Sequence, residues 1–227
     1  MGSVPLQRIG KLATATVALT AVSAAVSLLS VWASQAAQGD AEALLDGTIS
    51  TDDFVERAAP YLLMSTVQGV MTLATAVVTI IWMYRIAKNH RTLHRGTTWG
   101  PGWAIGGWFL PPLLFIIPSL VFREMWKASD PDVPIGGDWK SGRVSPVVPL
   151  WFLLYSVIPI VLLVVQSASG FNLGASERDL AQQIIDDQQA TVVGAVVAVA
   201  GAAAFIVLVR GLTARHRQLT GESATRA

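Results

Sequence analysis

The sequence predicts an all-α polytopic membrane protein with four transmembrane helices and one Pro/Trp-rich segment that is re-entrant or interfacial. Three observations support this fold class: the composition, the length of the apolar stretches, and the separation of charge along the chain. The 227 residues are 52% hydrophobic and 14% charged, whereas soluble domains carry about 25% charged residues. Too little charge remains to cover a soluble globule of this size, and a mean hydropathy of +0.52 agrees with this.

Four apolar stretches are long enough to cross a bilayer, which takes about 20 residues. They cover residues 12–36, 61–84, 147–166 and 191–209, and none contains Asp, Glu, Lys, Arg or His. Small residues recur on one face of the first and last stretches, which predicts close packing within the bundle or, alternatively, a homo-oligomer contact. These stripes are Ala18, Ala21 and Ala25 in the first stretch, and Gly194, Ala198, Gly201 and Ala202 in the last.

A fifth apolar stretch, residues 103–122, differs because it contains Pro111, Pro112 and Pro118. Proline removes a backbone donor and clashes with the preceding turn, so the double proline is expected to break or kink a helix. The parts on either side are each too short to span a membrane. Non-helical backbone at membrane depth requires protein or water around it.

Charge fixes the expected orientation, because cytoplasmic loops collect Lys and Arg. Fourteen of the 16 Lys and Arg fall in segments 1–11, 85–146 and 210–227, and ten of the 15 Asp and Glu fall in loops 37–60 and 167–190. The first set is therefore predicted to be cytoplasmic, with both termini, and the second to lie outside the plasma membrane. Both ends of residues 103–122 then lie on the cytoplasmic side, so this stretch does not cross.

The chain is expected to form a single membrane domain over residues 1–227. The two outer loops contain apolar residues at helical spacing, which predicts short amphipathic helices there. One includes Ala43–Leu45 with Phe54 and Val55, and the other includes Leu180, Ile184 and Ile185.

The sequence offers few groups for chemistry. It has no cysteine, which excludes thiolate chemistry, and it has no ionisable residue inside the four predicted spans to form a proton or ion path. His90 and His94 share a helix face, but a metal site would need another ligand such as Glu124. A basic interfacial helix is the favoured interpretation, and His216 is assigned to a basic tail. No catalytic residue, cofactor or metal is predicted.

The basic cytoplasmic face predicts contact with the bilayer and its anionic lipid headgroups, although the positive-inside rule alone also explains it. Nucleic acid is not expected as a partner. Tryptophan is concentrated at the same face, where its ring favours the interface. We expect the functional centre to comprise Arg85, Asn89, Trp103, Trp108, Pro111, Arg123, Glu124 and Trp126. In this hypothesis Glu124 pairs with Arg85 or Arg123 and latches the middle segment to the second span.

Three motifs carry a family resemblance: WMYRIAKN at residues 82–89, PGWAIGGWFLP at residues 101–111 and REMWKAS at residues 123–129. Together with Pro118 they resemble a bacterial membrane-protein family, common in actinobacteria, that is catalogued as a domain of unknown function. The resemblance covers roughly residues 60–210. It implies a similar number of spans and a Trp/Pro-rich middle segment, and it implies no catalytic residue.

The sequence thus favours a non-enzymatic plasma-membrane protein with a structural, sensing or interaction role. An oligomeric small-solute channel or transporter that uses the middle segment is the first alternative, because re-entrant segments line cavities. A lipid-modifying enzyme is the second, and would need a cytoplasmic Asp, His and Glu constellation.

Overall fold

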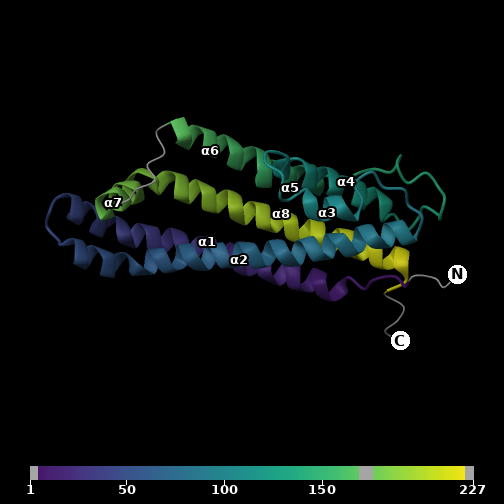
Figure 1. The fold of residues 1–227 in the computed structure, drawn as a ribbon, viewed down its shortest axis with the longest axis horizontal. Coiled ribbons are helices and arrows are strands. Elements are labelled where there is room, and N and C mark those ends of the chain that lie inside the picture. The colour runs from purple at the N-terminus through teal and green to yellow at the C-terminus, as the bar shows by residue number, and fades with distance from the viewer. Residues whose placement is uncertain (1–4, 169–175, 223–227) are drawn as a thin grey trace.

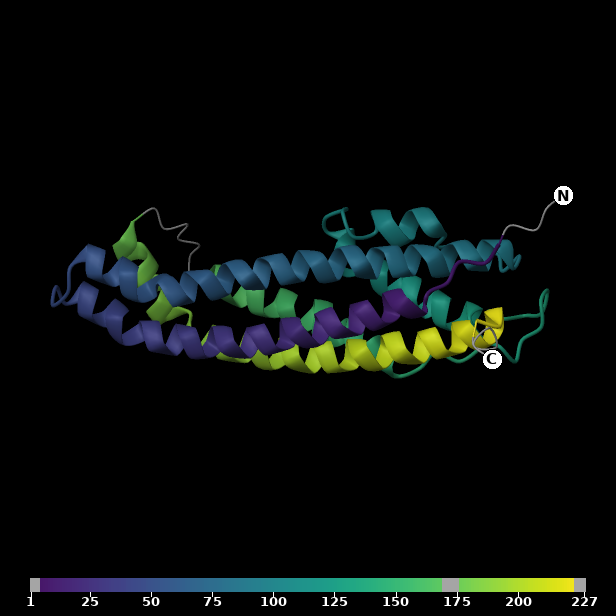
Figure 2. The same ribbon diagram turned by 90° about the horizontal axis from the view of Figure 1, so that it is seen from below.

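The computed structural model describes residues 5–168 and 176–222, and these form helices joined by turns and loops, without β-strands. Three long helices lie side by side: α1 (Gly10–Leu45), α2 (Thr51–Thr92) and α8 (Gln188–Thr220) (Figures 1 and 2). Each is long and apolar enough to cross a membrane. The predicted all-helical membrane fold is confirmed at this level.

The long helices expose most of their apolar surface. Within the most apolar stretches of α1, α2 and α8, the buried shares are 22%, 28% and 33%. Exposed Leu and Val side chains on this scale need an apolar surrounding, as a bilayer provides. Ala18, Ala21 and Ala25 belong to this exposed surface, whereas Gly201 packs on Leu154. The predicted small-residue packing within the bundle is therefore found for α8 at Gly201.

At one end of the bundle, helices occupy a stretch that was expected to be a loop. Residues 37–60 were expected to form an outer loop, but α1 continues to Leu45 and α2 begins at Thr51. Ser50 starts α2 with a capping box to Asp53, which satisfies free N–H groups of the first turn. The second expected amphipathic helix is present as α7 (Glu177–Asp186). It packs against α1, and its Ala181 and Ile184 join a cluster with the α1–α2 turn.

The opposite half of the molecule holds the middle segment (Figure 1). It comprises α3 (Pro101–Gly106), η1 (Leu113–Phe115) and α4 (Ile117–Ala128), so the helix break expected at the double proline is present. Gly107 lies against Ile117, and a Cβ there would overlap the Ile117 side chain. This close approach lets the chain double back between α3 and α4, next to the ends of α2 and α8.

A fourth, shorter apolar helix completes the bundle. It runs through α5 (Val147–Phe152), the π-helical turn η2 (Leu153–Val157) and α6 (Ile158–Ala168), and α5 packs on α8.

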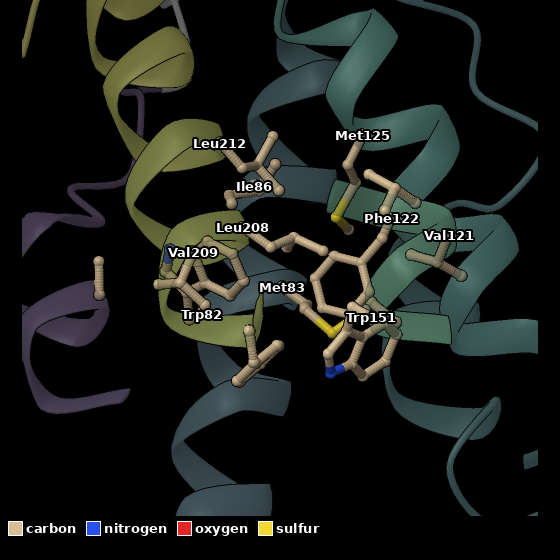
Figure 3. Packing of buried hydrophobic residues seen from close by; sticks show 14 of the residues in the cluster. Trp82, Met83, Ile86, Val121, Phe122, Met125, Trp151, Leu208, Val209 and Leu212 are labelled. Carbon is tan, nitrogen blue, oxygen red and sulfur yellow. The ribbon is translucent and has the colours of Figure 1, made fainter. Parts of the chain in front are cut away.

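The main core lies where α2, α4, α5 and α8 meet (Figure 3). Its centre is an aromatic group in which the Phe122 ring lies 5.0 Å from Trp151 and 5.9 Å from Phe205. Trp82 approaches Phe122 at 6.1 Å from the α2 side. This core fixes the ends of α2 and α8 relative to α4, and thereby positions the polar groups described next.

Candidate functional site

A buried polar cluster lies just beyond this core, at the ends of α2, α4 and α8. It consists of Asn89, His90, Ser129 and His216, all of them almost completely inaccessible. Asn89 and His90 extend the buried face of α2 that begins at Trp82, and His216 extends the buried face of α8 that includes Leu212. The sequence interpretation of His216 as part of a basic tail is therefore incomplete, because its ring is an interior group.

The hydrogen bonds of the cluster form one directed chain. The backbone of Gln7 fixes the Asn89 amide, since Gln7 N–H donates to Asn89 Oδ1 at 2.7 Å and Asn89 Nδ2 donates to Gln7 O at 2.8 Å. Asn89 Nδ2 also lies 3.0 Å from His216 Nε2, which must therefore be the acceptor. The neutral His216 ring then carries its proton on Nδ1 and donates to Ser129 Oγ at 3.1 Å.

Ser129 extends this chain to the second histidine. With its oxygen accepting from His216, its hydroxyl proton can be donated to His90 Nε2 at 2.9 Å. His90 Nδ1 is buried and has no hydrogen-bond partner in the part of the chain that the structure describes. Ser129 between two imidazoles resembles a base-activated nucleophile, yet its side chain is fully buried. In this conformation no substrate can reach it, so the arrangement acts as a clamp between helices.

Burial keeps both histidines neutral. The two residues lie beyond the apolar stretches, among Arg91, Arg95 and Arg215. Desolvation lowers the pKa of His216 to about 4. It also lowers the pKa of His90 well below its ordinary value, with smaller contributions from the neighbouring charges of His216 and Arg95. Both rings are therefore uncharged at neutral pH, as the hydrogen-bond chain requires.

The N-terminal segment is tied to this end of the bundle from two sides. Arg85 donates to the carbonyl of Arg8 at 3.0 Å, next to the Asn89 contact with Gln7. Gly221 ends α8 in the left-handed conformation at φ 71°, and the next residue, Glu222, accepts from the N–H groups of Ile9 and Gly10 at 3.2 and 3.1 Å. A carboxylate at the start of α1 also interacts favourably with the helix dipole.

Glu124 forms a different latch from the one expected. Its two carboxylate oxygens each accept a backbone N–H at 2.7 Å, from Thr98 and Trp99. Within residues 5–168 and 176–222 it makes no ion pair, so the predicted pairing with Arg85 or Arg123 is wrong. Backbone donors in the loop after α2 satisfy both oxygens, which leaves no need for an arginine.

Trp126 fastens α4 to α8. A Cβ added to Gly211 would lie 2.9 Å from the Trp126 ring, so the indole packs on bare backbone. Arg215 covers the same ring at 5.3 Å and pairs with Asp130 at 2.7 Å. The glycine, the tryptophan and the ion pair thus form a second connection beside the polar cluster.

Two surface hollows lie near these connections. One, of about 350 Å³, is lined by Arg123 with apolar side chains that include Leu120, Val148 and Phe152. The other, of about 300 Å³, is lined by Arg91, His94, Arg95, Gly96, Thr97 and Gly100.

The remaining predicted residues do not join a single centre. Trp103 packs edge-on against Trp99 at 5.2 Å, and Trp108 packs edge-on against Tyr155 at 5.8 Å. Pro111 lies in the turn between α3 and η1. The eight residues therefore lie at several separate points. Arg85 and Asn89 converge on the N-terminal segment, and Glu124 and Trp103 both contact Trp99.

A metal site has no support in the described residues. Among residues 5–168 and 176–222, no group of three or more His, Asp or Glu side chains is close enough to hold a metal ion. His94 turns away from the face of His90, because α2 ends at Thr92 and His94 adopts a left-handed φ of 53°.

Comparison with known protein families matches residues 46–214 to the domain of unknown function DUF4328. The chain belongs to the DUF4328 family. The match covers α2 to most of α8, and therefore includes Asn89, His90, Ser129 and the latch of Glu124, whereas His216 lies two residues beyond its end. No curated protein and no solved structure matches this DUF4328 chain.

Proposed function

We propose that this DUF4328 protein is a non-enzymatic component of the plasma membrane that senses or binds partners through the end of the bundle where α2, α4 and α8 meet. We call this end, formed by residues 5–10, 85–100, 123–146 and 210–222, the basic end. One observation carries the proposal: hydrogen bonds join five sequence-distant segments there into one ordered unit. These segments are residues 7–10, α2, residues 98–99, α4 and the end of α8.

Order of this kind suits recognition better than simple anchoring. A membrane anchor needs only the apolar helices, whereas a recognition surface needs side chains held in defined positions. Exposed cations surround the ordered unit, and Arg91 and Arg123 are among them. Their charge favours anionic lipid headgroups at the neighbouring leaflet.

The proposed topology has four spans with both termini in the cytoplasm. The helix from α5 through α6 supplies the fourth span, since residues 147–168 reach about 33 Å at 1.5 Å per residue. The α3–η1–α4 segment enters and leaves at the basic end as a re-entrant hairpin. Phe109 at its turn is 68% exposed, which supports contact with an apolar environment there.

Cysteine accessibility tests the topology directly, because the natural chain has no cysteine. A membrane-impermeant maleimide is expected to label Thr48→Cys from outside intact cells. Gly102→Cys and Asp138→Cys are expected to react only in inside-out vesicles. Labelling of Gly102→Cys or Asp138→Cys from outside would overturn the arrangement.

Site-specific photocrosslinking in living cells tests the proposed role in binding partners. A photoreactive residue at Arg91 or Asp138 is expected to give discrete adducts, and the same residue at Thr48 serves as the control. The interaction role would be rejected if only Thr48 gave adducts. Solute flux through proteoliposomes of the purified protein would instead favour the channel alternative.

A further inference from the structure

The hollow at the end of α2 contains an arginine whose hydrogen-bonding capacity is only partly used. Arg95 is 2% exposed, and its Nη2 donates to the carbonyls of Asp130 and Val133. Among residues 5–168 and 176–222, its buried Nε and Nη1 have no hydrogen-bond partner. A buried guanidinium with unpaired N–H groups is costly. An acceptor in the hollow would therefore stabilise this site once the Arg95 side chain turns toward it.

The surroundings of Arg95 are cationic, and no acidic residue of the described chain lines the hollow. Arg91 and His94 line it together with Gly96, Thr97 and Gly100. The charge of Asp130 acts on Arg95, but the Asp130 carboxylate forms its ion pair with Arg215, at 2.7 Å. Glu124 occupies two backbone donors of the same loop, but it does not line the hollow. Arg91 forms no ion pair among the described residues, so its charge remains available to a ligand.

The loop shape lets a ligand come close. Gly96 and Gly100 have no side chains, and a Cβ added at Gly100 would lie 3.4 Å from Arg91 Nη2. His94 begins the loop with φ 53° as the left-handed residue of the cap that ends α2, in which the Arg95 N–H donates to His90 O at 2.9 Å. Thr97 adds a hydroxyl. A volume of about 300 Å³ is at the lower end of the range for small-molecule sites.

We propose that this hollow binds a phosphoryl group. Phosphate oxygens accept several hydrogen bonds at once and carry negative charge, which matches two guanidinium groups, an imidazole and a hydroxyl. Arg91 lies seven residues beyond the end of the apolar stretch, about 10 Å along the helix, from where its long side chain can reach back to the headgroup layer. The phosphoryl group therefore belongs to an anionic lipid headgroup or to free phosphate. This inference rests on the proposed recognition role of the basic end and names its ligand chemistry.

Binding of inorganic phosphate to the purified full-length protein tests the site for free phosphate. The protein is placed in nanodiscs of phosphatidylcholine and titrated by calorimetry, with Arg91→Gln as the variant and Arg178→Gln, in α7 away from the basic end, as the control. Both arginines are exposed, so neither change threatens folding. Arg91→Gln is expected to weaken binding about tenfold, by loss of a charge-assisted hydrogen bond, and Arg178→Gln less than twofold.

A lipid source is tested in a second arm. Nanodiscs containing phosphatidic acid are released into the gas phase, and native mass spectrometry counts the lipids retained by each variant. Retention that Arg91→Gln reduces and Arg178→Gln does not assigns the site to a lipid headgroup, and phosphate binding in the first arm assigns it to a free ligand. The site is overturned if neither ligand binds, or if both variants weaken binding equally. Because nanodiscs expose both faces, these outcomes are independent of the proposed topology.

Discussion

At the scale of single residues, one backbone contact determines the state of several side chains. The peptide of Gln7 orients the Asn89 amide, the amide assigns the His216 tautomer, and His216 in turn donates to Ser129. Each step depends on a neutral imidazole, because a protonated His216 would place an N–H against the Asn89 amide donor. Protonation of the cluster is therefore expected to oppose folding.

Acidification should accordingly destabilise the protein. The folded pKa of His216 is about 4, below its ordinary value of about 6.5, and His90 is lowered in the same direction. Between these pH values the unfolded chain binds more protons than the folded chain, so the free energy of unfolding falls as the pH falls through this window. Each histidine lowers the free energy of unfolding by at most about 1.4 kcal/mol per pH unit.

Thermal unfolding in detergent between pH 8 and pH 4.5 measures this effect. His216→Gln keeps a polar side chain but does not titrate, so its melting temperature should depend less on pH than that of the parent. The exposed His94 provides the control, and His94→Gln should retain the parental pH dependence. Equal pH dependence in all three proteins would contradict the role of His216.

Glu124 and Asn89 were predicted from the sequence to be functional residues, and each of them anchors a distant segment. Their partners could not be predicted, because these include backbone groups that no pattern of side chains reveals. His216 could have been recognised as buried, because it continues the four-residue apolar spacing of Leu208 and Leu212 along α8. Its basic neighbours obscured that pattern.

At the scale of elements, α4 is held by two different devices. Glu124 binds the loop after α2, and Trp126 fills the space above Gly211 in α8. The amphipathic pattern of α4 was readable from the sequence, with Val121, Phe122 and Met125 on the buried face. The place of α4 in the bundle could not be read from the sequence, because it depends on Gly211, which lies 85 positions after Trp126.

Removal of the Glu124 carboxylate should release the loop while leaving α4 in place. Glu124→Ala deprives the N–H groups of Thr98 and Trp99 of their acceptors, and each such loss costs about 1–3 kcal/mol where the group stays buried. Hydrogen exchange followed by mass spectrometry should show faster exchange at residues 96–100. Arg123→Ala, one position away and exposed, is the control. Unchanged exchange in Glu124→Ala would rule out the latch.

Two glycines of α8 should respond oppositely to the same substitution. Gly211→Ala places a methyl group 2.9 Å from the Trp126 ring, and overpacking of this kind costs about 1–3 kcal/mol. Gly194→Ala meets no atom within 4 Å and gains helix propensity, which is worth up to about 1 kcal/mol. Unfolding by sodium dodecyl sulfate in mixed micelles compares the two. A destabilised Gly194→Ala or an unaffected Gly211→Ala would show that Trp126 does not fix α8.

At the scale of the whole molecule, the sequence predicted the membrane fold and the helix break because both follow from local composition. Apolar length identifies spans, and Pro111–Pro112 interrupts a helix wherever it lies. For residues 37–60 the sequence predicted a short amphipathic helix within an outer loop, but not that α1 continues to Leu45 and that α2 begins at Thr51. Their acidic residues indicated a loop, but the buried positions Ala41, Leu44 and Phe54 continue the helical pattern and pack with α7.

The described residues consequently form two cores toward opposite ends of the long helices, and the separation of these cores leads to a prediction about cooperativity. Phe54 is fully buried in the core beside α7. Figure 1 shows α7 and α4 at opposite ends of the bundle, and α4 carries Phe122 of the aromatic core. Phe54→Ala should destabilise the core beside α7 by about 3–5 kcal/mol. Since the two cores share no residues, the cost should fall on local opening of one end.

Hydrogen exchange distinguishes local from global opening. Phe54→Ala should accelerate exchange at residues 40–58 and 177–186 and leave residues 86–92 and 208–216 unchanged. Phe122→Ala should produce the reverse pattern, and the two effects on stability should add, because distant sites without shared partners are independent. Faster exchange at both ends from either substitution would mean that the long helices transmit strain over their full length, and that the basic end is not an independently ordered unit.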